Sequence, residues 1–221
     1  MDSTLEYIIN KYHLAPNRRG ATAIPNMGRD QLAELFAELG FKTGAEIGVE
    51  RGIYSEILLK ANPDLHLYSI DPWLASVYEP GIHAVDYDQE KIDSYYKIAK
   101  KRLTPYKNCE IIRKESLVAA KDFQDESLDF VYIDGNHNFV NVACDLHTWK
   151  KKVRLGGIVS GHDYAYYKLI KHDHVKHVLH AYTASYGITP FFVVGADATN
   201  QPGIIRDKFR SWFWVKTEKM L

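Results

Sequence analysis

The sequence predicts an α/β protein built on a doubly wound, mostly parallel sheet. The first observation is an alternation of strand-like and helix-like segments from position 42 onward, which is typical of parallel strands joined by crossover helices. The second is a turn with two glycines, Gly48 and Gly52, between the first of these strands and its helix. The third is size: 221 residues, 46% of them hydrophobic, are enough for one core without disulfides.

The predicted elements begin with a helix that follows an irregular segment. Residues 17–27 combine proline, glycine, asparagine and two arginines, which predicts a loop. We therefore expect an N-terminal arm over 1–28 and a single domain over 29–221. Apolar residues at helical spacing predict a helix over Arg29–Leu39, which ends before Gly40.

Strands and helices then alternate. The predicted strands are Gly44–Val49, Leu65–Ile70, Glu110–Arg113, Leu128–Ile133 and Gly157–Ser160, and Ile53–Ala61 is a helix closed by Asn62-Pro63. Another helix has Val142, Leu146 and Trp149 on one face and lysines in its last turn, where cations suit the helix dipole. Residues 73–103 hold a loop and a helix-like run, which is a candidate lid. Phe191–Val194 and Trp212–Lys216 predict a closing antiparallel pair.

Composition bounds the class of partner. Lysine plus arginine equals aspartate plus glutamate, 28 against 28, which argues against nucleic acid or an anionic membrane and favours a small molecule. Cys109 and Cys144 lack metal-ligand spacing, which fits a reduced, cytoplasmic setting. Residues 1–10 do not resemble a signal peptide, and no segment is apolar enough to span a bilayer. Aromatic residues near the C-terminus suit either a core or a homo-oligomer.

The turn after the first parallel strand predicts a nucleoside site. Ligands of open parallel sheets bind beyond the carboxyl ends of the strands, where Gly48 and Gly52 permit close backbone approach. Asp71 follows the next strand and is placed to accept hydrogen bonds from ribose hydroxyls. A dinucleotide fingerprint would need glycine where Glu50 and Ile53 stand, and an acid suits a sulfonium better than a pyrophosphate. A tight turn without a ligand is the alternative.

Five motifs together resemble a known family. They are Ala45–Gly52 (AEIGVERG), Ser69–Trp73 (SIDPW), Glu115-Ser116, Asp129–His137 (DFVYIDGNH) and Gly156–Tyr164 (GGIVSGHDY). The chain resembles class I S-adenosylmethionine-dependent methyltransferases from about Asp30 to Val215, in particular the branch with macrocin O-methyltransferase and cephalosporin-hydroxylase-like proteins. The resemblance implies a seven-stranded sheet and S-adenosylmethionine as the cofactor. The cofactor residues that it implies are Glu46, Gly48, Glu50, Gly52, Tyr54, Ser55, Asp71, Trp73, Glu115, Ser116 and Asp134.

Relatives in this branch often bind a divalent cation, and the matching positions here are Asp134, His162 and Asp163. Asp134 ends one predicted strand and the other two end the next, so these side chains can converge. Two carboxylates and an imidazole could hold magnesium, manganese, iron or zinc, and the nitrogen ligand shifts preference away from magnesium. Relatives often carry an acid where His162 stands, so the metal remains open.

The resemblance also makes His137 the catalytic proton acceptor, assisted by Asp134. An imidazole titrates near neutrality, and a metal would lower the pKa of the acceptor hydroxyl. A helix-start residue bonded to nearby backbone is the alternative for His137. Other histidines, at 172, 174, 177 and 180, predict a solvated helix rather than a metal site. Tyr164, Tyr166 and Tyr167 are candidates for lining a substrate pocket.

The sequence thus predicts an O-methyltransferase acting on a small hydroxylated acceptor, such as a sugar or a natural-product intermediate. Three alternatives stay open: a cofactor-binding protein without transfer activity, an N-methyltransferase, and a hydroxylase-like reaction at the metal. The acceptor itself cannot be identified from the residues.

Overall fold

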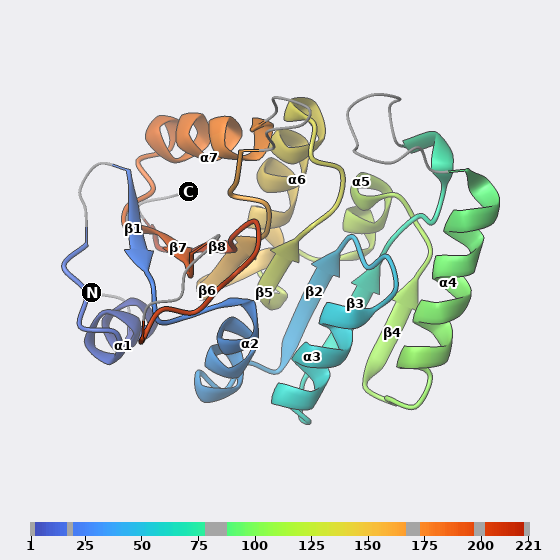
Figure 1. Cartoon of the computed structure of the whole chain (residues 1–221), viewed down its shortest axis with the longest axis horizontal. Helices are drawn as coiled ribbons and strands as arrows, with labels where there is room; N and C mark the ends of the chain where they lie inside the picture. The colour runs from blue at the N-terminus through green and yellow to red at the C-terminus, as the bar shows by residue number, and fades with distance from the viewer. Residues whose placement is uncertain (1–2, 17–19, 78–87, 167–172, 197–201, 219–221) are drawn as a thin grey trace.

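A computed structural model describes the chain except residues 1–2, 17–19, 78–87, 167–172, 197–201 and 219–221 (Figure 1). Its single eight-stranded sheet has the order β1-β7-β8-β6-β5-β2-β3-β4. The strands are β1 (Ala21–Ile24), β2 (Thr43–Ile47), β3 (His66–Ile70), β4 (Cys109–Ile112), β5 (Leu128–Ile133), β6 (Val153–Gly161), β7 (Phe191–Val194) and β8 (Trp212–Val215). The helices are α1 (Ser3–Lys11), α2 (Arg29–Glu38), α3 (Ile53–Ala61), α4 (Gln89–Leu103), α5 (Ser116–Ala119), α6 (Phe139–Lys152) and α7 (His174–Ser185), with short 3-10 turns at Ala75–Val77 and Ala120–Asp122.

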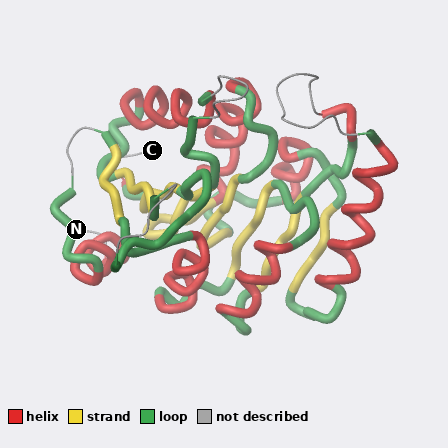
Figure 2. Tube along the Cα trace, viewed as in Figure 1, coloured by secondary structure: helices red, strands yellow, loops and turns green. Residues whose placement is uncertain are grey.

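Helices cover both faces of the sheet, as the doubly wound prediction requires (Figures 1 and 2). One core layer includes buried residues of α1 to α4, and the other includes buried residues of α6 and α7. The amphipathic patterns explain the arrangement, because α2 buries Leu32 and Phe36 against one face and α6 buries Leu146 and Trp149 against the other. The fold class predicted from the sequence is confirmed.

Register across the central strands aligns the ends that carry the motifs. Ile47 of β2 pairs in parallel with Ile70 of β3 and with Ile133 of β5, which in turn pairs with Gly161 of β6. The next residue of each strand therefore lies at one edge of the sheet. These next residues are Gly48, Asp71, Asp134 and His162.

The sheet has one strand more than the seven that the resemblance implied. Strand β1 lies within the 17–27 segment, which we had expected to be a loop, and it pairs in parallel with β7 from Ala21↔Phe191 to Ile24↔Val194. A four-residue strand carries too little periodicity to be recognised locally, and its hydrogen-bonding partner lies about 170 residues later in the chain. Helix α1 was likewise not predicted.

Part of the candidate lid, residues 89–103, is α4, which lies in the connection from β3 to β4 and contacts α3. Residues 78–87 of that segment lie outside the described residues. The predicted antiparallel tail is confirmed, because β7 pairs antiparallel with β8, and β8 pairs antiparallel with β6.

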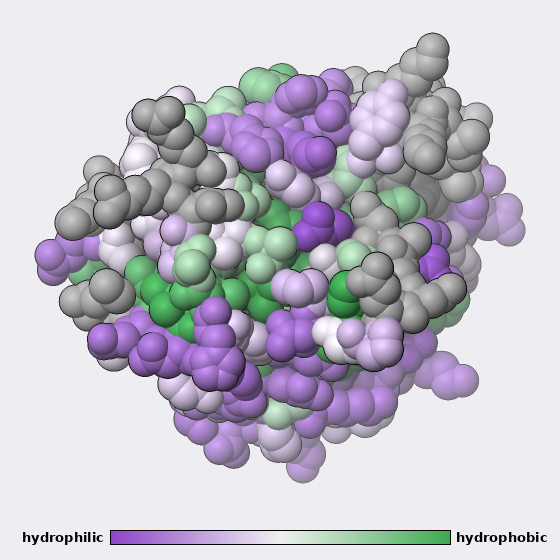
Figure 3. Space-filling view, turned by 60° about the vertical axis from the view of Figure 1, so that its left-hand side comes forward, coloured by the Kyte–Doolittle hydropathy of each residue, from purple (hydrophilic) through white to green (hydrophobic). Residues whose placement is uncertain are grey.

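The surface is mixed in character. In the face shown in Figure 3, apolar side chains gather in a central band that hydrophilic residues border above and below. Among the described residues, no helix combines the length and the apolar character needed to cross a lipid bilayer. Both cysteines are free thiols, Cys109 in β4 and Cys144 in α6.

Candidate functional site

The glycine turn closes against the neighbouring loop. Gly48 has a φ of +91°, and a Cβ added there would lie 2.1 Å from the carbonyl oxygen of Asp134, so no side chain fits. Its N–H donates to the carbonyl of Ile70 at 2.9 Å, and the N–H of Asp134 donates to the carbonyl of Ile47 at 2.7 Å. The two loops therefore touch through backbone alone, which leaves space for a ligand on both sides.

Two cavities meet at this contact, and both include Gly48 and Gly135 in their walls. The smaller, of about 140 Å³, extends toward the start of α5 and one face of α6. The larger, of about 400 Å³, extends toward α2, the start of α3 and the ends of β5 and β6. Together they form a crevice along the carboxyl edge of the central strands, divided at the Gly48 contact, where the sequence predicted a ligand.

Most of the predicted cofactor residues face these cavities. Those lining the larger cavity are Glu46, Gly48, Glu50, Tyr54 and Asp134, and those lining the smaller one are Gly48, Asp71, Glu115 and Ser116. Three other predicted residues lie behind the loop instead. Gly52 begins α3 against Leu103, Ser55 contacts Glu46, and the buried Trp73 donates its indole N–H to the carbonyl of Glu50 at 2.8 Å. In the structure these three support the loop and do not line either cavity.

Glu46 is a buried carboxyl group at the floor of the larger cavity. Its side chain accepts a hydrogen bond from the hydroxyl of Ser55, which in turn accepts one from Ser69 at 3.0 Å. Burial raises the pKa of Glu46 to about 8, although the Ser55 hydrogen bond and Arg29 act in the opposite direction. Glu46 therefore has acceptor capacity that a cationic group in the cavity would satisfy.

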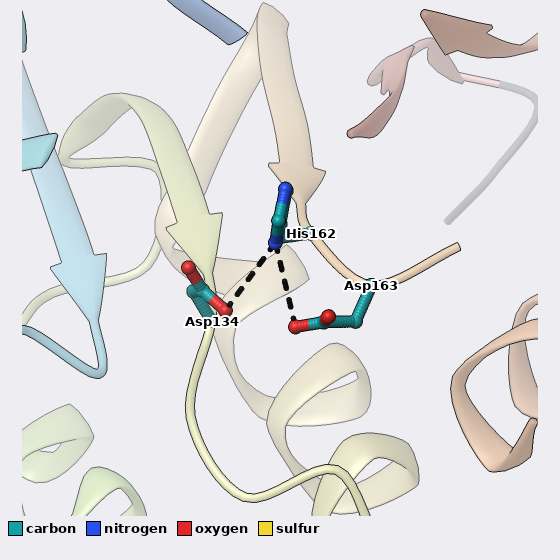
Figure 4. Close-up of side chains that lie close together, drawn as sticks. All are labelled: Asp134, His162 and Asp163. Carbon is teal, nitrogen blue, oxygen red and sulfur yellow. Dashed lines mark ion pairs between the residues drawn. The ribbon is translucent and has the colours of Figure 1, made fainter. Parts of the chain in front are cut away.

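The predicted metal ligands converge (Figure 4). Asp134, His162 and Asp163 each offer one ligand atom, and these atoms all lie within 4.8 Å of one another. Nδ1 of His162 lies 3.4 Å from Oδ2 of Asp163 and 3.9 Å from Oδ1 of Asp134. The indole N–H of Trp212 donates to the carbonyl of His162 at 2.8 Å, which holds the end of β6 in place.

His137 completes this group. Its Nε2 lies 2.8 Å from Oδ2 of Asp163 and 3.5 Å from Oδ1 of Asp134. Burial alone would lower the pKa of His137, but the two carboxylates outweigh it and raise the pKa to about 10. With both carboxylates charged, the imidazole therefore carries a proton at neutral pH.

Sequence reasoning did not identify Arg29, which lies in the wall of the larger cavity. Its guanidinium stacks 4.4 Å above the ring of Tyr54, and one nitrogen lies 3.9 Å from Oδ2 of Asp134. Its Nε is buried with no hydrogen-bond partner among the described residues. The only sequence signal was its place at the first position of a predicted helix, where a cation is unusual.

Sequence reasoning also missed Asp145, in the wall of the smaller cavity. It lies three residues after Val142 and four before Trp149, on the face of α6 that packs against the sheet. An acid on an apolar helix face was the signal that could have identified it.

The other candidates that the structure describes line neither of the two cavities. The hydroxyl of Tyr164 contacts Nε2 of His180 at 2.8 Å, and Tyr166 is exposed. His177 pairs with Asp173 at 3.0 Å, and Nδ1 of His174 accepts a hydrogen bond from the N–H of Phe139. Tyr167 and His172 lie outside the described residues.

Comparison with known proteins gives three findings. Residues 45–164 match a family described as methyltransferase domain. The fold is similar to the O-methyltransferase TomG from Streptomyces achromogenes, solved with SAM (TM-score 0.56, 17% identity, covering 98% of this chain and 91% of that one). It is also similar to an O-methyltransferase from Bacillus cereus solved with SAH (0.56, 14%, 98% and 92%) and to the N-methyltransferase NodS from Bradyrhizobium japonicum (0.56, 12%, 86% and 95%). No curated protein matches the chain.

Proposed function

This chain belongs to the methyltransferase-domain family, and from that premise we propose that it transfers the methyl group of S-adenosylmethionine to a hydroxyl oxygen of a small acceptor. The match over residues 45–164 and the fold support its assignment as an S-adenosylmethionine-dependent methyltransferase. The observation that carries the finer proposal is the row of Gly48, Asp71, Asp134 and His162 at one edge of the sheet, with a cavity on either side of the Gly48 contact.

The two cavities suit the two ends of the methyl donor. The larger one has the acidic side chain of Glu50 at its rim and the buried acid Glu46 at its floor. A cation beside Glu46 would favour its ionised form, so both groups suit the ammonium and sulfonium charges of the methionine end. The smaller one lies beside Asp71 and has apolar walls that include Ile47 and Ile70, which suit a ribose and a base. With the methyl donor bound in this way, its sulfonium methyl group would lie toward Asp134 and His137.

The residues present fit a divalent cation. Asp134, His162 and Asp163 supply two oxygens and one nitrogen within 4.8 Å, a donor set that suits manganese, iron or zinc better than magnesium. His162 is buried, and the hydrogen bond from Trp212 to its backbone carbonyl holds the chain at the end of β6. When bound there, such a cation would lower the pKa of an acceptor hydroxyl.

His137 supplies the proton acceptor in this proposal. The charges of Asp163 and Asp134 raise its pKa, so compensating those charges returns the imidazole toward its ordinary pKa, where it can accept a proton near neutral pH. Arg29, 3.9 Å from Asp134, is a positioning residue that orients this carboxylate. Methyl transfer to oxygen releases the hydroxyl proton, and His137 takes it.

The test has two parts. Calorimetry with S-adenosylhomocysteine measures occupation of the crevice. Incubation with methyl-labelled S-adenosylmethionine, manganese and a panel of sugars and phenols, each beside its amine counterpart, measures transfer by mass spectrometry. We expect label on hydroxylated compounds only, with rates that fall at least a hundredfold in Asp134→Asn and His137→Gln. Asp122→Asn, an exposed acid paired with Lys114, is the matched control.

Other results would contradict the proposal in distinct ways. Label on amines alone would favour an N-methyltransferase. Binding of S-adenosylhomocysteine without turnover would favour a cofactor-binding protein that lacks transfer.

The proposal has three further parts. They are a cytoplasmic location, a homo-oligomeric state, and a small acceptor without nucleic acid or membrane partners.

A further inference from the structure

The smaller cavity contains a carboxylate that the proposed chemistry does not use. Asp145 is only 5% exposed and lines this cavity together with Ser116, Gly135 and Asn141. Asp134 and His137, which the proposed function places beside the transferred methyl, line the larger cavity on the other side of the Gly48 contact. Asp145 lines the smaller cavity and not the larger one, so it does not belong to the group around the transferred methyl.

One oxygen of Asp145 has a defined partner. The hydroxyl of Ser116 donates its proton to Oδ1 of Asp145, and the same hydroxyl accepts a hydrogen bond from the indole N–H of Trp149 at 2.8 Å. Because an ionised carboxylate can only accept, the Ser116 hydroxyl is the donor in this pair, and the indole N–H of Trp149 uses one of its lone pairs. Oδ1 is thus satisfied inside the protein.

The second oxygen has no such partner. Ser116 is the one described residue that donates a hydrogen bond to this carboxylate, and no described cationic side chain forms an ion pair with it. Oδ2 lies 3.9 Å from the position that a Cβ on Gly135 would take, directly under the loop that both cavities share. A buried carboxylate with a single neutral donor is costly, and burial raises the pKa of Asp145 to about 6. A ligand with an N–H donor would relieve that cost.

We propose that Asp145 recognises the exocyclic amino group of the adenine ring and so selects an adenosyl donor over one with another base. The inference rests on the proposed function, which puts the base of the methyl donor in the smaller cavity. Adenine presents two N–H donors at its amino group and only acceptors at its ring nitrogens. An ionised carboxylate only accepts hydrogen bonds, so Oδ2 can pair with the amino group and with no other edge atom of the base.

A base with a carbonyl in place of the amino group offers a matched probe. S-inosylhomocysteine differs from S-adenosylhomocysteine in this way, and its carbonyl oxygen would face the carboxylate oxygen without a proton between them. Because the inosyl compound loses a hydrogen bond to a charged group, we expect the unchanged chain to bind S-adenosylhomocysteine at least about tenfold more tightly. Calorimetry on the full chain at pH 7.5 measures both affinities.

Asp145→Asn tests the assignment to this side chain. The Ser116 hydroxyl still needs an acceptor, so the amide oxygen takes the place of Oδ1 and the amide nitrogen takes the place of Oδ2. The amide then donates toward the base, which favours the inosyl compound. We expect the preference for S-adenosylhomocysteine to fall at least tenfold, while Asp122→Asn keeps the original ratio.

The outcomes are distinguishable. If Asp145→Asn changes both affinities by the same factor, the ratio stays unchanged. With S-adenosylhomocysteine still bound, that result would show that Asp145 only joins α6 to α5, and it would overturn the inference. Absence of S-adenosylhomocysteine binding in the unchanged chain would overturn the proposed function and the inference with it. Thermal unfolding confirms that the variant is folded, and Asp145→Ser, which keeps an acceptor for Ser116, serves as a second variant and should lose the preference without reversing it.

Discussion

Oδ2 of Asp71 accepts a hydrogen bond from the backbone N–H of Val49 at 2.9 Å. The same oxygen accepts from the N–H of Glu50 at 3.0 Å, and Oδ1 accepts from the N–H of Trp73 at 2.7 Å. The carboxylate thus joins the end of β3 to the glycine loop after β2. A carboxylate has about four acceptor sites, so after these three hydrogen bonds Asp71 retains capacity for one ribose hydroxyl. It organises the loop and also lines the smaller cavity.

Asp71→Asn should loosen this loop. An amide cannot accept on both sides, so at least one buried backbone N–H loses its partner, at a cost of about 1–3 kcal/mol. We expect a lower unfolding temperature and at least about tenfold weaker binding of S-adenosylhomocysteine, measured by thermal unfolding and calorimetry. Asp64→Asn, which removes an exposed ion pair with Lys42, should leave both values nearly unchanged. Equal behaviour of the two variants would refute the role given to Asp71.

Gly48→Ala should be far more harmful than an alanine at another left-handed glycine. At Gly48 the added Cβ would meet the Asp134 carbonyl, whereas at Gly40, with a φ of +69°, nothing lies within 4 Å. Both variants carry the conformational cost of about 1–2 kcal/mol, but only Gly48→Ala must also separate two loops. We expect Gly40→Ala to keep its affinity for S-adenosylhomocysteine and Gly48→Ala to lose it. Retained affinity in Gly48→Ala would mean that the loops do not need to touch.

Glu46 should make folding stability depend on pH. Its folded-state pKa, about 8, is raised above the ordinary value of 4.5, so its contribution is fully present below pH 4.5 and is lost as the pH rises toward 8. Glu46→Gln, which resembles the protonated acid, should match the unchanged chain at pH 5 and exceed it at pH 8. The gap should grow by up to about 1.4 kcal/mol per pH unit in urea unfolding. Glu110→Gln, at an exposed position, is the control and should show no such gap.

The two thiols should differ in how a ligand protects them. Cys144 lines the smaller cavity, whereas Cys109 lies in β4 beside Ser69 and lines neither cavity of the crevice. We expect S-adenosylhomocysteine to slow alkylation of Cys144 by iodoacetamide several-fold and to leave Cys109 unaffected, as followed by peptide mass spectrometry. Protection of both thiols to the same degree would indicate general stabilisation instead of occupation of that cavity.

Asp163→Asn should lower the pKa of His137. The Asp163 carboxylate lies 2.8 Å from Nε2 of His137 and is the largest of the influences that raise this pKa to about 10. With a chelator present, NMR titration of the imidazole should show the pKa of His137 moving toward its ordinary value of 6.5 in the variant. An unchanged titration would mean that Asp134 alone sustains the charged imidazole.

Much of the site follows from short-range patterns. Strand β5, Leu128–Ile133, was predicted with its observed bounds, and Asp134 follows it directly. Because parallel strands of similar length share an edge, the residues after β2, β3, β5 and β6 had to lie near one another. This is why the sequence could point to Gly48, Asp71, Asp134, His162 and Asp163 as neighbours.

Three features depended on contacts between distant parts of the chain. Strand β1 is stable as a strand only because β7 supplies its hydrogen bonds, Arg29 reaches Asp134 from a helix about 100 residues earlier, and Asp145 reaches Ser116 from the next helix. The charge states of His137 and Glu46 were also decided by burial and by neighbours from other elements. By itself the sequence determined the doubly wound fold and the edge where the motifs meet, since periodicity and the alternation of strands with helices are properties of short segments. Only the tertiary structure decided which side chains face the crevice and which support it, because packing and desolvation depend on residues that no local pattern brings together.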